Sequence, residues 1–421
     1  MKKAFIFFIS FTLSMSIGAQ PVVKSVLKES RQKYYRYLVD KSILGNLASP
    51  LGSEHEDSWE TAFWTITFIN YKEPIVVAKI EEAFTNIWQR SNSFQRALLE
   101  LIYTDYKNKY LTEVKGLLLR SIDPRAFAMC AEYIMASDNF LSEKKNLLQR
   151  TRTLLAKDAA NPILNQLLYR LNHKGMKTAP PSLASLLAKD YLPGQVLVIS
   201  FQRSNRDYTG LSIVRDAAGK FLKNDDSSYT AIPQLARSAS NMSGYLSNGN
   251  TPEGIFRMRG FDVSKSNILG PSVNIQMTMP GEYKASQFFQ DSTVNDSAWE
   301  LRRYEALLPQ NLRSYYPMLQ SYYAGRAGRT EIIAHGNTVD PSFYLNQPYY
   351  PISPTQGCLC TKEIWSEITG RLITSDQVRL TEAVKRAGGP KGYYIVVNID
   401  DKDAPVTMND VLLLFKNINQ Y

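Results

Sequence analysis

Cysteine and histidine are scarce in this chain of 421 residues, which has three of each. Three cysteines cannot build the disulfide framework of a small secreted domain, and in an oxidising compartment at least one thiol stays unpaired. After the first 20 residues the chain also lacks an apolar run long enough to span a membrane. What the chain does have is length for about two domains with large hydrophobic cores.

The first 19 residues have the order of a secretory signal peptide. Lys2 and Lys3 form a charged start, residues 4–15 are apolar, and residues 16–19 are mostly small. This start contains no cysteine, the usual acceptor for a bacterial lipid anchor. We therefore expect a protein that is periplasmic or secreted.

The chain has a formal net charge of +10, and removing Lys2 and Lys3 lowers it to +8. A basic chain is attracted to acidic polymers and surfaces, such as a cell-wall polymer, an anionic lipid or a nucleic acid. Export argues against nucleic acid. Because the excess is spread along the sequence, solubility explains it equally well.

Residues 20–178 are predicted to form an all-helical domain, either a bundle or a short α-solenoid. Asp123-Pro124 and Asn161-Pro162 are typical helix starts, and their separation of 38 residues lies in the range of helical-pair repeats. Cys130 lies within an apolar stripe, which predicts a buried structural thiol.

Residues 185–421 are predicted to form a second, mainly β domain that folds by itself, so the fold class is α+β. Apolar runs rich in β-branched and aromatic residues predict strands at residues 196–201, 211–214, 255–258, 273–279 and 393–399. The order of strands favours a mainly antiparallel sheet with a few helices.

The stretch from Glu331 to Cys360 contains most of the residues suited to chemistry. Residues 331–334 are predicted to form a short buried strand before His335, and the prolines of residues 346–357 predict a loop. Cys358 follows Gly357. A helix is expected to begin at Thr361, with its apolar side formed by Ile364, Trp365 and Ile368.

This arrangement suits a thiol nucleophile. Thiolate is the reactive form of cysteine, and a helix start and a nearby imidazole lower the thiol pKa. Gly357 allows a sharp turn that presents backbone N–H groups to an oxyanion, and His335 can act as the general base. Cys358, His335 and Gly357 are therefore the predicted catalytic residues, with no cofactor and no metal.

Two motifs resemble a known family. His335-Gly336 followed by Thr355-Gln356-Gly357-Cys358-Leu359 resembles the signature of L,D-transpeptidases with the YkuD-type catalytic domain. Upstream, residues 250–256 (NTPEGIF) resemble the family's Thr-Pro-x-Gly-x-Phe turn. Gln356 stands where the family usually has a second histidine, and Cys360 where it usually has Arg or Asn.

The resemblance covers about residues 191–400 and implies a YkuD-like sandwich fold and an enzyme that acts on peptidoglycan stem peptides. Cys358 would form an acyl-enzyme with a stem tetrapeptide. An amine of a neighbouring stem then resolves it, or water does so in an L,D-carboxypeptidase. The helical domain would bind a protein partner or the wall.

Six further residues are predicted to contact substrate. Arg326 and Arg329 belong to a basic loop, and the forked guanidinium group of arginine suits a substrate carboxylate. Tyr350 offers an aromatic face. Three more flank the candidate catalytic pair in the sequence: Asn337, Thr355 and Gln356.

Two alternatives use the same residues differently. Cys358, Cys360 and His335 together offer three zinc-ligand types, although the second domain contains no further His or Cys. The departures at Gln356 and Cys360 favour a non-catalytic wall-binding protein that keeps the fold without the activity.

Overall fold

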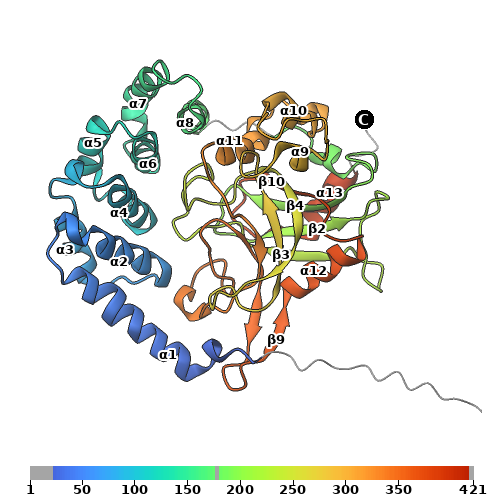
Figure 1. Cartoon of the computed structure of the whole chain (residues 1–421), viewed down its shortest axis with the longest axis horizontal. Coiled ribbons are helices and arrows are strands. Elements are labelled where there is room, and N and C mark those ends of the chain that lie inside the picture. The colour runs from blue at the N-terminus through green and yellow to red at the C-terminus, as the bar shows by residue number, and fades with distance from the viewer. Residues whose placement is uncertain (1–21, 176–179, 417–421) are drawn as a thin grey trace, which may run out of the picture.

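The computed structural model describes residues 22–175 and 180–416, so the predicted signal peptide lies outside the described residues. Eight α-helices form an arc on one side, and a β-rich part lies within its curve (Figure 1). We call these eight helices the helical arc: α1 (Lys28–Tyr37), α2 (Glu56–Ile69), α3 (Pro74–Ala83), α4 (Asn92–Asp105), α5 (Leu111–Arg120), α6 (Pro124–Met135), α7 (Phe140–Leu155) and α8 (Pro162–His173).

The arc has the two-row construction of a solenoid. Helices α2, α4, α6 and α8 contact one another in succession and form the row nearer the β-rich part, while α3, α5 and α7 lie outside (Figure 1). The predicted helix starts are confirmed, because Asp123 accepts a hydrogen bond from the N–H of Ala126 and Asn161 from that of Leu164. Cys130 is fully buried in the arc, as predicted.

The β-rich part is built on an eight-stranded sheet in the order β3-β2-β1-β10-β4-β5-β6-β7. The pairs β1–β10 and β6–β7 are parallel, and the other neighbours are antiparallel. The predicted runs at residues 196–201, 211–214, 255–258, 273–279 and 393–399 all fall on strands. The bounds are β1 (Val196–Arg203), β2 (Gly210–Arg215), β3 (Ala231–Gln234), β4 (Gly254–Val263), β5 (Val273–Thr278), β6 (Ala334–His335), β7 (Leu359–Cys360) and β10 (Gly392–Asp400).

The two edges of this sheet meet, so that the sheet nearly closes. The residue after β3, Leu235, exchanges two backbone hydrogen bonds with Cys360 of β7, at 2.7 and 2.9 Å. Further along, the N–H of Ala239 donates to the carbonyl of Thr355. The segment that contains Cys358 is therefore held from both sides by backbone hydrogen bonds.

Each face of the sheet has its own apolar core. Leu197, Ile199 and Phe201 of β1 pack on one side, where α9–α11 and α13 cover the sheet, and Val198 packs on the other, against α12. The helices are α9 (Ala285–Phe289), α10 (Leu301–Ala306), α11 (Gln320–Arg326), α12 (Asp376–Arg386) and α13 (Met408–Lys416). The fold is thus a helical N-terminal part followed by a mixed sheet with helices.

Two local predictions near Cys358 are wrong. The strand before His335 is β6 and begins at Ala334, because Glu331 has a positive φ of 61° that interrupts an extended chain. The segment after Thr361 is not helical. It forms the two-stranded ribbon β8 (Glu363–Trp365) and β9 (Leu372–Ser375), with Ile368 exposed at its turn.

The arc and the β-rich part share a core. Met242, Tyr245 and Leu246, from the loop between β3 and β4, are buried among the helices of the arc, and the Tyr245 hydroxyl donates to Glu132 of α6. Independent folding of residues 185–421 would expose these apolar side chains. None of the helices in the described ranges is long and apolar enough to cross a membrane.

Candidate active site

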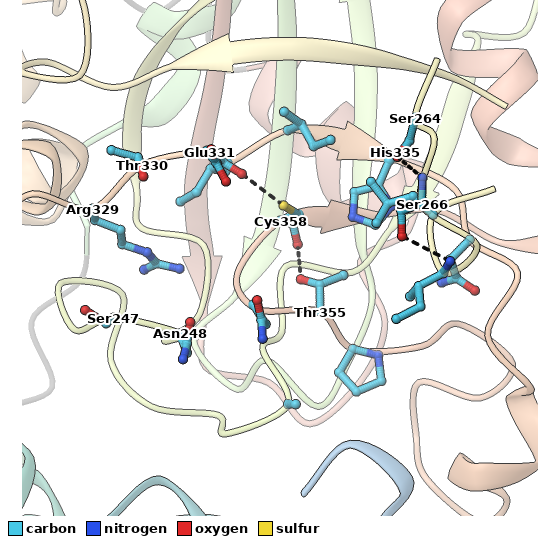
Figure 2. A pocket seen from close by; sticks show the side chains of 18 of the residues that line it. Ser247, Asn248, Ser264, Ser266, Arg329, Thr330, Glu331, His335, Thr355 and Cys358 are labelled. Carbon is cyan, nitrogen blue, oxygen red and sulfur yellow. Dashed lines mark hydrogen bonds between the residues drawn. The ribbon is translucent and has the colours of Figure 1, made fainter. Parts of the chain in front are cut away.

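A cleft of about 1280 Å³ lies between the helical arc and the sheet. Cys358, His335 and Thr355 line its sheet side (Figure 2). The arc contributes the other wall, which consists mostly of apolar side chains of α2 and α4: Phe63, Trp64, Thr67, Phe68, Ala97 and Glu100. The structure thus brings the two candidate catalytic residues into one concave site.

Cys358 follows a turn that requires glycine. Gly357 has φ +115°, and a Cβ there would collide with the Arg329 guanidinium and lie 2.5 Å from the carbonyl oxygen of Gly249. The Thr355 hydroxyl accepts from the N–H of Gly357 at 2.9 Å and donates to the carbonyl of Cys358 at 2.9 Å. We call residues 355–358 the nucleophile turn.

The two sequence motifs contact each other at this turn. Thr251, from the Thr-Pro-x-Gly segment before β4, is buried and donates from its hydroxyl to the carbonyl of Gly357 at 2.8 Å. Arg329 donates to the carbonyls of Gly244, Gly249 and Asn250 in the same loop. The loop before β4 is therefore fixed against the nucleophile turn.

The thiol of Cys358 is protonated at neutral pH. Burial raises its pKa to about 11, the N–H of Ile333 and the Arg329 guanidinium oppose the shift, and nearby carboxylates add to it. The sulfur lies 3.3 Å from the carbonyl oxygen of Glu331, to which the S–H donates. The expected helix start is missing here, so the sequence-based prediction of a lowered thiol pKa is wrong.

His335 is buried at the end of β6, and its ring orientation is fixed by the backbone. Nδ1 lies 2.5 Å from the carbonyl oxygen of Gly336. Because a carbonyl only accepts, Nδ1 has the proton and Nε2 is the free basic nitrogen. Burial lowers the pKa of His335, so the ring is neutral at pH 7.

Neighbouring segments bring Cys358 and His335 to the cleft. His335 of β6 pairs with Cys360 of β7, and Cys358 lies just before that strand. Figure 2 shows both at the cavity. In the described residues no hydrogen bond joins the sulfur to the imidazole, a contact that catalytic pairs often complete only when substrate binds.

One backbone N–H of the turn is available to an oxyanion. The N–H of Gly357 is used by Thr355, whereas the N–H of Cys358 has no acceptor among the described residues. Of the backbone N–H groups that were expected to bind an oxyanion at this turn, only the N–H of Cys358 is therefore available. Thr355, predicted to contact substrate, lines the cleft, and its hydroxyl also shapes the turn.

Arg329 is in the cleft wall but is not free to bind a carboxylate. It is buried, and its guanidinium donates to three backbone carbonyls. Burial lowers its pKa to about 10, and the nearby acidic groups of Cys358 and Glu100 oppose the shift when they are ionised. The loop was predicted to be flexible and basic, but at Arg329 it is buried, and this side chain holds the loop before β4 in place.

The other predicted substrate residues separate into two groups. Gln356 is exposed at the cleft, and Asn337 lines it. Arg326, exposed at the end of α11, and Tyr350, which is 47% exposed, are not among the residues that line the cleft. The structure therefore brings Thr355, Gln356 and Asn337 together with Cys358 and His335, and it leaves Arg326 and Tyr350 outside.

Cys360 lies beneath the site. It is fully buried, it accepts from the Asn337 amide at 2.9 Å, and burial raises its pKa. All three cysteines are free thiols. Within the described residues, no group of three His, Cys, Asp or Glu side chains is arranged to hold a metal ion, so the geometry gives the zinc alternative no support.

Sequence reasoning missed the contribution of the arc to this site. Trp64 and Glu100 are 294 and 258 residues from Cys358 in the sequence, and no local motif marks them. Comparisons with protein-family models, with curated proteins and with solved structures find no match.

Proposed function

We propose that this protein is an exported cysteine acyltransferase that acts on peptidoglycan stem peptides, in the manner of L,D-transpeptidases. The observation that carries the proposal is the pairing in one cleft of Cys358, on a glycine-dependent turn, with His335, whose Nδ1 is fixed by a carbonyl. The contact of Thr251 with Gly357 also supports it, because it joins the two motifs that resemble this family.

In the first half-reaction, the sulfur of Cys358 attacks the carbonyl carbon of the third stem residue while Nε2 of His335 takes the thiol proton. The Cys358 N–H stabilises the oxyanion. The C–N bond to the terminal D-amino acid then breaks, and its nitrogen leaves with the proton from His335. The product is a thioester on Cys358.

In the second half-reaction, an amine or water attacks the thioester. An amine of a neighbouring stem gives a direct cross-link, and water gives L,D-carboxypeptidase activity. In both cases His335 takes a proton from the attacking amine or water, the C–S bond breaks, and His335 passes that proton to the sulfur.

A high thiol pKa is compatible with this chemistry when the proton moves during attack. The thiol and the imidazole are both neutral at pH 7, so His335 is ready to act as a base. The same raised pKa, and the missing contact between sulfur and ring, favour a second candidate. This is a wall-binding protein in which Cys358 is unreactive.

Intact-mass measurement separates the two candidates. The mature chain is incubated with a carbapenem and, separately, with purified tetrapeptide muropeptides. We expect a covalent adduct with the parent, none with Cys358→Ser, and a rate of adduct formation lower by about 10²–10⁴-fold with His335→Ala. His173→Ala is the matched control, since His173 is exposed at the end of α8. A parent that forms no adduct and leaves the muropeptides intact would support the wall-binding candidate.

A further inference from the structure

Glu100 is the one charged side chain that the described part of the helical arc contributes to the cleft. It lies on α4, in the inner row of helices. Both of its carboxylate oxygens accept from the Asn248 amide, each at 3.2 Å. The arc therefore presents a fixed carboxylate to a site whose other wall contains the candidate nucleophile.

The negative charge of Glu100 is incompletely balanced. Among the described residues it forms no salt bridge, although Arg96 and Arg329 are close enough to act on it electrostatically. The guanidinium N–H groups of Arg329 donate to backbone carbonyls instead of to Glu100. Burial raises the pKa of Glu100 to about 7 despite these neighbours. A bound cation would supply the positive charge that the protein does not pair with this carboxylate.

The wall of the cleft that contains Glu100 also contains an aromatic side chain suited to an organic cation. Trp64 is partly exposed at the cleft and is stacked on Phe68, with ring centroids 5.0 Å apart. Aromatic faces attract ammonium groups. In Figure 2, Arg329 and Asn248, the partner of Glu100, lie to one side of Cys358, and His335 lies to the other.

The cleft also has room for more than one ligand. Its volume of about 1280 Å³ is above the range of about 300–1,000 Å³ for pockets that hold one small molecule. A peptide bound at Cys358 would leave the end formed by α2 and α4 for a second peptide.

We propose that Glu100, with the aromatic face of Trp64 on the same wall of the cleft, binds the side-chain ammonium group of the acceptor peptide. This inference rests on the function proposed above and makes an amine, rather than water, the second substrate. The bound ammonium loses one proton to solvent, and its nitrogen attacks the thioester. The new C–N bond replaces the C–S bond, and the second proton passes through His335 to the sulfur of Cys358.

Equilibrium binding tests this subsite without requiring turnover. The full mature chain with Cys358→Ser is titrated with a purified disaccharide tetrapeptide that has a free side-chain amine, and with the same compound N-acetylated at that amine. Adding Glu100→Gln should weaken binding of the free-amine compound about tenfold and leave binding of the acetylated compound unchanged. Glu113→Gln, on the exposed side of α5, is the matched control and should change neither.

Three results would overturn the subsite: equal weakening of both compounds by Glu100→Gln, weakening of neither, or no binding of either compound by the Cys358→Ser protein. Equal weakening would mean that Glu100 only holds the arc against the loop at Asn248. Amine-selective weakening together with an unreactive Cys358 in the parent would support the subsite and remove the acyltransferase proposal, so the two failures are distinguishable.

Discussion

The hydroxyl of Thr251 donates to the carbonyl of Gly357 at 2.8 Å, which links segments 106 residues apart. Both groups are buried, so neither can turn to water when the other is removed. This hydrogen bond and the clamp made by Arg329 fix the turn that presents Cys358. The position of the nucleophile thus depends on the loop before β4.

Thr251→Val should therefore reduce reactivity at Cys358 without touching the cleft. It keeps the side-chain shape but leaves the Gly357 carbonyl unpaired, which costs about 1–3 kcal/mol. We expect a lower melting temperature and slower alkylation of Cys358 by iodoacetamide. Thr251→Ser keeps the hydroxyl and is the control. Equal alkylation rates in the Val and Ser variants would show that the contact does not position the sulfur.

Gly357→Ala should be much more damaging than an alanine at an ordinary glycine. The residue has φ +115°, and an added Cβ meets Arg329 and the carbonyl of Gly249, which are held by one another. We expect loss of covalent labelling and a melting temperature lower by several degrees, or an insoluble protein. Gly116→Ala in α5 is the matched control, because no atom lies nearer than 4.0 Å to its added Cβ and alanine favours a helix. A soluble Gly357→Ala protein that labels at the parental rate would contradict this account.

The sequence predicted those elements that local pattern determines. Apolar runs marked β1 and β10, and the Asp-Pro and Asn-Pro pairs marked the starts of α6 and α8. The sequence-based prediction failed where hydrogen bonds to distant parts of the backbone determine the secondary structure. After Cys360 the N–H of Thr361 donates to the carbonyl of His335, and the indole of Trp365 donates to that of Asn337, so a segment with helical spacing becomes a strand.

The site shows the same division. Cys358, His335 and Gly357 could be named from motifs, since their chemistry is local. The role of Arg329 could not, because its three acceptors come from a loop some 80 residues earlier in the chain. Nor could the wall that contains Glu100 be foreseen, because only the curvature of the arc brings α4 opposite the sheet.

The two cysteines of the segment should behave differently on substitution. Cys358 faces the cleft, whereas Cys360 is fully buried against Asn337. We expect Cys358→Ser to abolish labelling by a thiol-reactive β-lactam, and Cys360→Ser to keep it, with less inhibition by oxidant if a disulfide between the two forms. The measurement is intact mass with and without reductant. Labelling of Cys358→Ser at the parental level would identify another nucleophile.

Glu100 should cost the protein stability at neutral and alkaline pH. Its folded-state pKa is raised from 4.5 to about 7 by burial, so the folded protein holds this proton more tightly than the unfolded chain does. The stabilising effect of the proton is complete below pH 4.5 and is lost as the pH rises through 7. Glutamine stays neutral throughout, so Glu100→Gln should raise the melting temperature more at pH 8 than at pH 5.

Charged and polar groups around Glu100 limit the rise in its pKa. Arg96 on the same helix and Arg329 from the opposite wall both favour its ionised form, and Asn248 donates to it. Glu113→Gln, on the exposed side of α5, is the matched control. A Glu100→Gln variant that is stabilised at pH 8 and loses amine binding would place this carboxylate among residues kept for binding at the expense of stability. A variant equally destabilised at both pH values would instead make Glu100 a structural link between α4 and the loop at Asn248.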